Sequence, residues 1–181
     1  MRWRRISGMA GRGLLMMGMM ALAGTAKAQS AVVFDDTKFF QVFHKADDTQ
    51  SMTEFLPEGQ DLKSWSRLTS IRIFPKLTEP RTAAAGLLRA VRENNPDAKS
   101  ILVENPKTGD VIIDFITWPR DQSFVEFNIF RYSKKGGGLQ MEQYAQRAYG
   151  NDVREFLIKL KTERQRLVNV MAKRGLKKTR K

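Results

Sequence analysis

The stretch VIIDFITW, residues 111–118, predicts a β-strand in the interior of a sheet. Nearly every position is apolar, whereas a strand with one face in water alternates between apolar and polar residues. Turn-forming residues bound the stretch, at positions 105–110 before it and at Pro119 after it. A short apolar run between turns is typical of a central strand that is covered on both faces.

Five further strands are expected from alternating or aromatic-rich runs, at residues 39–44, 52–56, 68–74, 101–104 and 123–132. The last two flank the central run through short turns, which favours an antiparallel meander. Between the two groups of strands, Pro80 begins a predicted helix that ends before Pro96.

The C-terminal part is interpreted as two helices. Residues 139–149 are assigned to the first because Met141, Tyr144, Ala145 and Ala148 recur at helical spacing. A longer amphipathic helix follows, with Gly175 as its C-terminal cap. The expected fold is therefore α+β: a single domain at residues 29–174, an antiparallel sheet of five or six strands, helices packed on at least one face, and a long C-terminal amphipathic helix.

The first 28 residues predict a cleavable export signal. Four arginines and no acid precede an uncharged apolar run at residues 14–24: Arg2, Arg4, Arg5 and Arg12. This run is shorter than the roughly 20 residues that span a bilayer. Residues 25–28 form a small-x-small ending, which favours cleavage between Ala28 and Gln29. The expected location is the periplasm, or alternatively the medium, and the Arg4–Arg5 pair leaves twin-arginine export open beside the general route.

The positive charge is concentrated at the C-terminus. The predicted signal removes five of the thirteen net charges, so the chain from Gln29 carries +8. Six basic residues lie within the last nine positions: Lys173, Arg174, Lys177, Lys178, Arg180 and Lys181. Residues 175–181 are expected to be a basic tail. Because an exported protein seldom meets nucleic acid, an acidic envelope protein or another anionic surface is the expected partner.

No set of residues indicates catalysis, and neither a metal nor a cofactor is predicted. The absence of cysteine excludes disulfides and thiolate ligands, and no run beyond the signal is long enough to cross a membrane. His44 is the only histidine and is interpreted as a polar residue at a strand end. Asp114 lies within the central strand, where it needs either a partner, such as Arg72 or Arg131 on a neighbouring strand, or a face exposed to solvent. The triglycine at 136–138 is interpreted as a flexible connector.

The segment EFLPEGQDLKSW, residues 54–65, resembles a stretch of uncharacterised secreted bacterial proteins, in which a strand ends in Pro-x-Gly and a tryptophan follows. The order of elements is also similar to the small α/β/α sandwiches of the PsbP and DcrB type. That likeness implies an exported accessory protein without a catalytic centre.

The sequence thus predicts a non-enzymatic exported protein that binds an envelope protein or an anionic surface. The basic residues of the tail, with Trp65 and Trp118, are the possible interaction residues, although each tryptophan also suits the closure of a small core. One alternative is a carrier of a small ligand or lipid, with a cleft between sheet and helices. A weaker alternative is a hydrolase that uses acidic residues such as Asp114.

Overall fold

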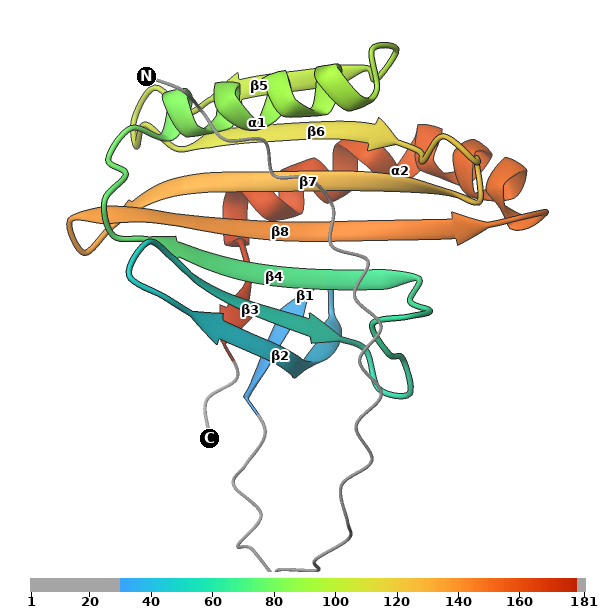
Figure 1. Ribbon diagram of the computed structural model, residues 1–181, viewed down its shortest axis with the longest axis horizontal. Helices are drawn as coiled ribbons and strands as arrows, with labels where there is room; N and C mark the ends of the chain where they lie inside the picture. The colour runs from blue at the N-terminus through green and yellow to red at the C-terminus, as the bar shows by residue number, and fades with distance from the viewer. Residues whose placement is uncertain (1–29, 179–181) are drawn as a thin grey trace, which may run out of the picture.

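The computed structural model describes residues 30–178, so the predicted signal, its cleavage site and residues 179–181 lie outside the described part. Within that part, nine strands form one antiparallel sheet and two helices pack against it (Figure 1). The elements are β1 (Ala31–Phe34), β2 (Thr37–Ala46), β3 (Ser51–Leu56), β4 (Arg67–Phe74), α1 (Pro80–Asn94), β5 (Ser100–Glu104), β6 (Val111–Thr117), β7 (Phe124–Lys135), β8 (Gly138–Tyr149), α2 (Asp152–Arg174) and β9 (Lys177–Lys178). The strand order is β5-β6-β7-β8-β4-β3-β2-β1-β9.

The predicted α+β class and the long C-terminal helix are confirmed, but the expected sheet of five or six strands is too small. One reason is that Leu139–Tyr149 belongs to strand β8 and not to a helix. Gly136 and Gly137 have φ values of 56° and 82°, and Lys135 pairs with Gly138, so a two-residue turn joins β7 to β8. The triglycine is therefore part of a hairpin between the two longest strands, and the connector interpretation is wrong.

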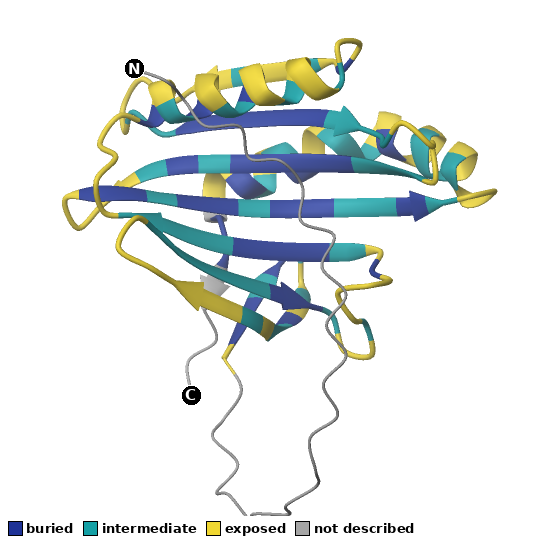
Figure 2. Ribbon diagram, in the orientation of Figure 1, coloured by how far each residue is buried: buried dark blue, intermediate teal, exposed yellow. Residues whose placement is uncertain are grey.

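The two helices cover opposite faces of the sheet, which we call the α1 face and the α2 face. Ala84 and Leu88 of α1 share a buried cluster with Val111, Ile113 and Phe115 of β6. Leu160, Leu167 and Met171 of α2 share another with Ile112 of β6 and with Phe127 and Ile129 of β7. Residues of β6 thus enter both clusters, and Figure 2 shows β6 mostly buried and β7 and β8 mostly buried or half-buried. Coverage of both faces of β6 is confirmed, although only β5 separates it from the sheet edge.

The other end of the sheet folds over the α2 face. Three strands separate β1 from β8 in the strand order, yet Phe34 of β1 stacks on Tyr144 of β8. A break in register between Gln41 and Phe43 accompanies the bend of β2. The curved strands bring Val32, Phe34 and Phe39 into the same core cluster as α2. The α2 face is consequently concave.

The basic tail was predicted to begin at residue 175, but the fold continues to residue 178. Helix α2 ends at Arg174, and Gly175 caps it with a φ of 57° and a bond from its backbone nitrogen to the carbonyl of Met171, as expected. Beyond that cap, however, Leu176 is buried in the α2-face core, and Lys177–Lys178 pair with Val33 and Val32 of β1. The fold includes these residues because an apolar side chain can be buried there and an edge strand can accept backbone hydrogen bonds.

Candidate functional site

An open groove of about 380 Å³ lies on the α2 face, where β2, β3 and β4 curve towards the β7–β8 hairpin. We call it the concave groove. Its apolar lining consists of Phe55, Ile71 and Ile73, and its polar lining consists of Ser30, Gln41, His44, Ser51, Thr53, Lys135 and Gln140.

The pairing of the strands places these side chains on one face. Thr53 lies opposite His44 on one side and Ile71 on the other, because β3 runs between β2 and β4. Ile73 in turn lies opposite Gln140 of β8. Side chains directly opposite one another in an antiparallel sheet project to the same face. His44 and Thr53 are also joined by a hydrogen bond of 2.9 Å between Nδ1 and Oγ1.

The electrostatic character of the concave groove favours anions. None of its lining residues is acidic, whereas Lys135 contributes a cation and His44 an imidazole. The ammonium of Lys135 donates a hydrogen bond of 2.5 Å to Oε1 of Gln140. Gln140 holds its side chain in place by donating from Nε2 to Oε1 of Glu142 at 3.1 Å.

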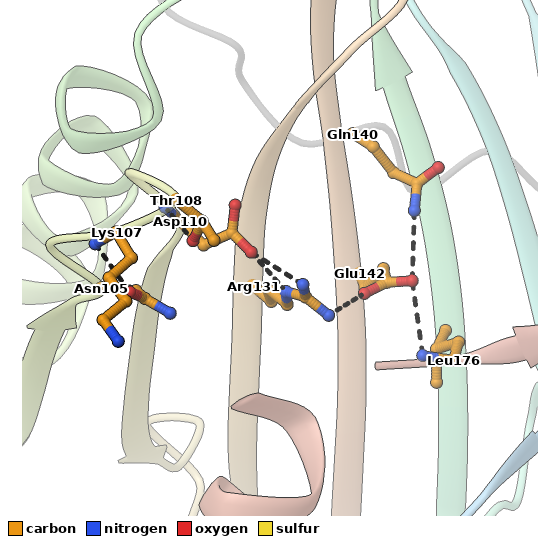
Figure 3. A network of polar contacts seen from close by, with 8 residues as sticks. All are labelled: Asn105, Lys107, Thr108, Asp110, Arg131, Gln140, Glu142 and Leu176. Carbon is orange, nitrogen blue, oxygen red and sulfur yellow. Dashed lines mark hydrogen bonds and ion pairs between the residues drawn. The ribbon is translucent and has the colours of Figure 1, made fainter. Parts of the chain in front are cut away.

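Glu142 connects the groove to Leu176, which lies between α2 and β9 (Figure 3). Its Oε1 also accepts a hydrogen bond of 3.3 Å from the backbone nitrogen of Leu176. On the other side, Arg131 lies 3.6 Å from its second oxygen and donates two hydrogen bonds to Asp110. Burial raises the pKa of Glu142, and Arg131 opposes this effect. One polar network therefore fixes both Gln140 at the groove and the residues that lead into β9.

The close approach at Gly175 tightens this connection. A Cβ atom at position 175 would lie 2.5 Å from Oε2 of Glu142 and 2.7 Å from NH1 of Arg131. Only a glycine allows the chain to pass the Glu142–Arg131 pair with a positive φ at this distance. The path from α2 to β9 is thus fixed at the same carboxylate that supports the groove.

The structure does not gather the predicted interaction residues into one site. Arg174 ends α2 and Lys177 and Lys178 form β9, whereas Lys173 is exposed and Arg180 and Lys181 lie outside the described residues. The indole of Trp65 is buried, with the guanidinium of Arg147 4.0 Å from its ring centroid. Trp65 therefore closes the core and is not an exposed interaction residue.

Trp118 is half-buried, and Asn95 fixes its backbone through two hydrogen bonds. Trp118 does not line the concave groove.

Asp114 is paired, but with a different arginine from those expected. Nε of Arg164, on α2, donates to its Oδ1 at 2.6 Å, whereas Arg131 is held by Asp110 and Glu142. Burial raises the pKa of Asp114, and the hydrogen bond from Arg164 opposes this. Among residues 30–178, no three His, Cys, Asp or Glu side chains are grouped so that they could hold a metal ion.

Sequence reasoning missed most of the groove. Treating residues 139–149 as a helix removed Gln140 from the sheet and concealed the hairpin that carries Lys135. The Gly136–Gly137 pair between two alternating runs was the available signal for a two-residue hairpin. Thr53 and His44 were each placed on a strand, but the curvature that turns both towards Lys135 depends on contacts distant in sequence.

Comparison with known proteins places the chain in a family. Residues 26–176 match the model of a protein family that is uncharacterised. No curated protein matches the chain. Neither helix in the described residues is sufficiently long and apolar to cross a membrane.

Proposed function

The chain belongs to this uncharacterised protein family, and we propose that it is an exported, non-enzymatic protein that binds an acidic segment of an envelope protein. The concave groove is the proposed binding site. The observation that carries the proposal is the charge of this groove, whose lining includes Lys135 and His44 and no acid.

The position of the basic C-terminus supports an acidic partner. Strand β9 pairs with β1 so that Lys178 lies opposite Val32, two residues from Ser30 in the groove lining. The basic residues up to Lys178 therefore belong to a segment whose backbone pairs with β1, the strand that follows Ser30 of the groove lining. Positive charge of this density attracts acidic segments over a distance of about 10 Å at 0.1 M salt.

The shape of the groove favours a segment of chain. The concave groove extends along β2, β3 and β4 towards the β7–β8 hairpin, with hydroxyl and amide groups of Thr53, Ser51 and Gln140 in its lining. An extended segment can lie along such a groove and contact several strands at once. Such groups bind the backbone and carboxylates of an extended segment, while Lys135 supplies a charge-assisted hydrogen bond.

A labelled octaglutamate peptide tests the groove. We expect Lys135→Glu to weaken binding about tenfold at low salt, because reversal of a charge close to the peptide replaces an attraction with a repulsion. Lys134→Glu is the matched control: it changes the net charge equally, but Lys134 points to the α1 face and pairs with Glu79. Equal loss in the two variants would show unspecific charge attraction and reject the groove as the site.

Export needs a separate test. The protein should begin at Gln29 when it is recovered from the periplasmic fraction and its N-terminus is sequenced. Recovery in the membrane fraction with residues 14–24 still attached would reject the proposed location, whatever the peptide experiment shows.

A further inference from the structure

A second groove, of about 360 Å³, lies on the opposite face of the sheet, between the second half of α1 and strands β6, β7 and β8. We call it the α1 groove. Leu87 and Val91 of α1 pack against the cluster that includes Phe115 and Phe130 of the sheet, and these four side chains give the groove its apolar lining. The rings of Phe115 and Phe130 are nearly parallel, at an angle of 14° and a centroid separation of 5.6 Å.

The floor of the α1 groove is polar and ordered. Ser70 donates to Oε1 of Gln143 at 2.9 Å, and Nε2 of Gln143 donates to Oδ1 of Asn128 at 2.8 Å. Nδ2 of Asn128 then donates to Oε1 of Glu126 at 2.8 Å. We call these four residues the amide ladder. Gln143, Asn128 and Glu126 also line the groove.

The amide ladder presents hydrogen-bonding capacity in a fixed orientation. Each side-chain amide carries two N–H donors and an oxygen with two lone pairs, and the ladder uses one of each in Gln143 and Asn128. Because the two residues lie on neighbouring strands, their positions are set by the sheet before any ligand arrives. Such preorganisation lowers the entropic cost of binding.

The charge of the α1 groove is internally balanced. Glu126 is the only ionisable residue in its lining. Arg147 donates two hydrogen bonds to Oε2 of Glu126, at 2.6 and 3.0 Å. The guanidinium lies 4.0 Å from the ring centroids of both Trp65 and Phe124, so aromatic contacts hold it in place. A charged ligand would find no unpaired counter-charge here.

Apolar walls with a few convergent polar groups are the usual composition of a small-molecule site. From the parallel phenyl rings, the amide floor and the paired charge, we propose that the α1 groove binds a small, neutral, flat ligand whose apolar body lies between α1 and the sheet. One edge of this ligand both donates and accepts hydrogen bonds, as a primary amide does. This site lies on a different face from the concave groove and does not depend on the function proposed for it.

Two neutral probes of similar size test the ligand class. We expect 2-naphthamide to bind about tenfold more tightly than 2-methylnaphthalene in equilibrium dialysis, because only the amide can replace water at Gln143 and Asn128. Gln143→Met should remove this preference while leaving the binding of 2-methylnaphthalene within about twofold. Absence of 2-naphthamide binding to the unchanged protein would overturn the proposal.

A pair of helix variants tests the location. Ala90 is exposed and lines the α1 groove, whereas Ala85 is exposed on the same helix and does not line it. Ala90→Phe should weaken 2-naphthamide binding about tenfold or more, and Ala85→Phe should leave it within about twofold. Neither change touches the buried core, so loss of folding does not explain a difference. Equal binding by the two variants would place the probe elsewhere and reject the site.

Discussion

The ring of Phe34 on β1 stacks on the ring of Tyr144 on β8, with their centroids 4.2 Å apart and an interplanar angle of 28°. Strands β2, β3 and β4 separate β1 from β8 along the sheet, so this contact exists only because the sheet folds over its α2 face. Phe39 adds an edge-on contact to the same tyrosine at 6.4 Å. Tyr144 of β8 is therefore the residue that β1 and β2 contact where the sheet folds over.

Truncation of Phe34 should destabilise the whole protein. Because the side chain is 1% exposed, Phe34→Ala should cost about 3–5 kcal/mol in the free energy of unfolding measured with urea. Phe40→Ala on the next strand is the control, since Phe40 is half-buried and its ring lies near the ammonium of Lys38. A loss for Phe34→Ala no larger than for Phe40→Ala would mean that the fold-over contributes little to stability.

Truncation of a buried side chain of α2 should also destabilise the protein far more than truncation of an exposed one. Leu160 is 3% exposed and belongs to the α2-face core, so Leu160→Ala should cost about 2–5 kcal/mol. Ile158→Ala should change the melting temperature little, because Ile158 is 58% exposed on the same helix. An unchanged melting temperature for Leu160→Ala would show that α2 is not part of the core.

Sequence reasoning was correct for the elements that depend on local periodicity or on the backbone preference of a single residue. The face of α2 that includes Leu160 and Leu167, the cap at Gly175 and the coverage of β6 on both faces all follow from local periodicity or backbone preference. Asp114 was expected either to have a partner or to face solvent, because it interrupts an apolar strand, and the structure shows a partner. Its identity, Arg164, depends on how α2 crosses the sheet, which no local pattern encodes.

Strand β8 shows why local pattern fails elsewhere. Its apolar residues at 141, 144, 145 and 148 satisfy helical spacing only because both faces of the strand are covered, which removes the alternation that identifies a strand. The four-residue strand β1 was missed because it is too short to show alternation. Its turn was a better signal, since Asp35 and Asp36 adopt φ values of 48° and 58°, as a two-residue hairpin turn requires. The error on β8 affected both grooves, because Gln140 lines the concave groove and Gln143 lines the α1 groove.

The pH dependence of stability should report the burial of Glu142. Its pKa is higher in the folded protein than its ordinary value of 4.5, because burial disfavours the charged form. The folded state therefore binds the proton more tightly, and this group's contribution to stability is full below pH 4.5 and lost as the pH rises through the raised pKa.

Glu142→Gln removes this titration and keeps an oxygen that accepts from Leu176. The unfolding free energy of the unchanged protein should consequently rise relative to that of Glu142→Gln when the pH falls from 7 towards 4.5. Urea unfolding at several pH values measures the difference between the two proteins. A difference that stays constant over this range, or changes in the opposite direction, would contradict the pKa shift.

Gly175 should be far less replaceable than another glycine with positive φ. Gly175→Ala combines an unfavourable backbone conformation with a Cβ atom 2.5 Å from Glu142. Gly59→Ala is the matched control, because Gly59 has a φ of 79° and nothing within 4 Å of the added atom. The control should cost about 1 kcal/mol and Gly175→Ala clearly more, measured by urea unfolding. Equal costs would show that the approach of α2 to Glu142 is not tight.

Two C-terminal truncations should separate folding from binding. Removal of residues 179–181 deletes Arg180 and Lys181 but keeps β9, so the melting temperature should not change. Removal of residues 176–181 also deletes Leu176, which is 8% exposed in the core and donates its backbone N–H to Glu142. This longer truncation should lower stability by about 2–5 kcal/mol, the range for loss of a buried leucine side chain.

Binding of octaglutamate should depend on the positive charges that a truncation removes, and not on its effect on stability. The shorter truncation removes two positive charges, each worth on the order of 1 kcal/mol near an anionic surface, so the peptide should bind about tenfold or more weakly at low salt. The loss should shrink at 1 M salt, where the Debye length falls to about 3 Å. If the protein without residues 179–181 binds the peptide as tightly as the full chain at low salt, Arg180 and Lys181 have no part in recognition. The acidic partner would then depend on Lys135 and on the basic residues that remain at positions 173–178.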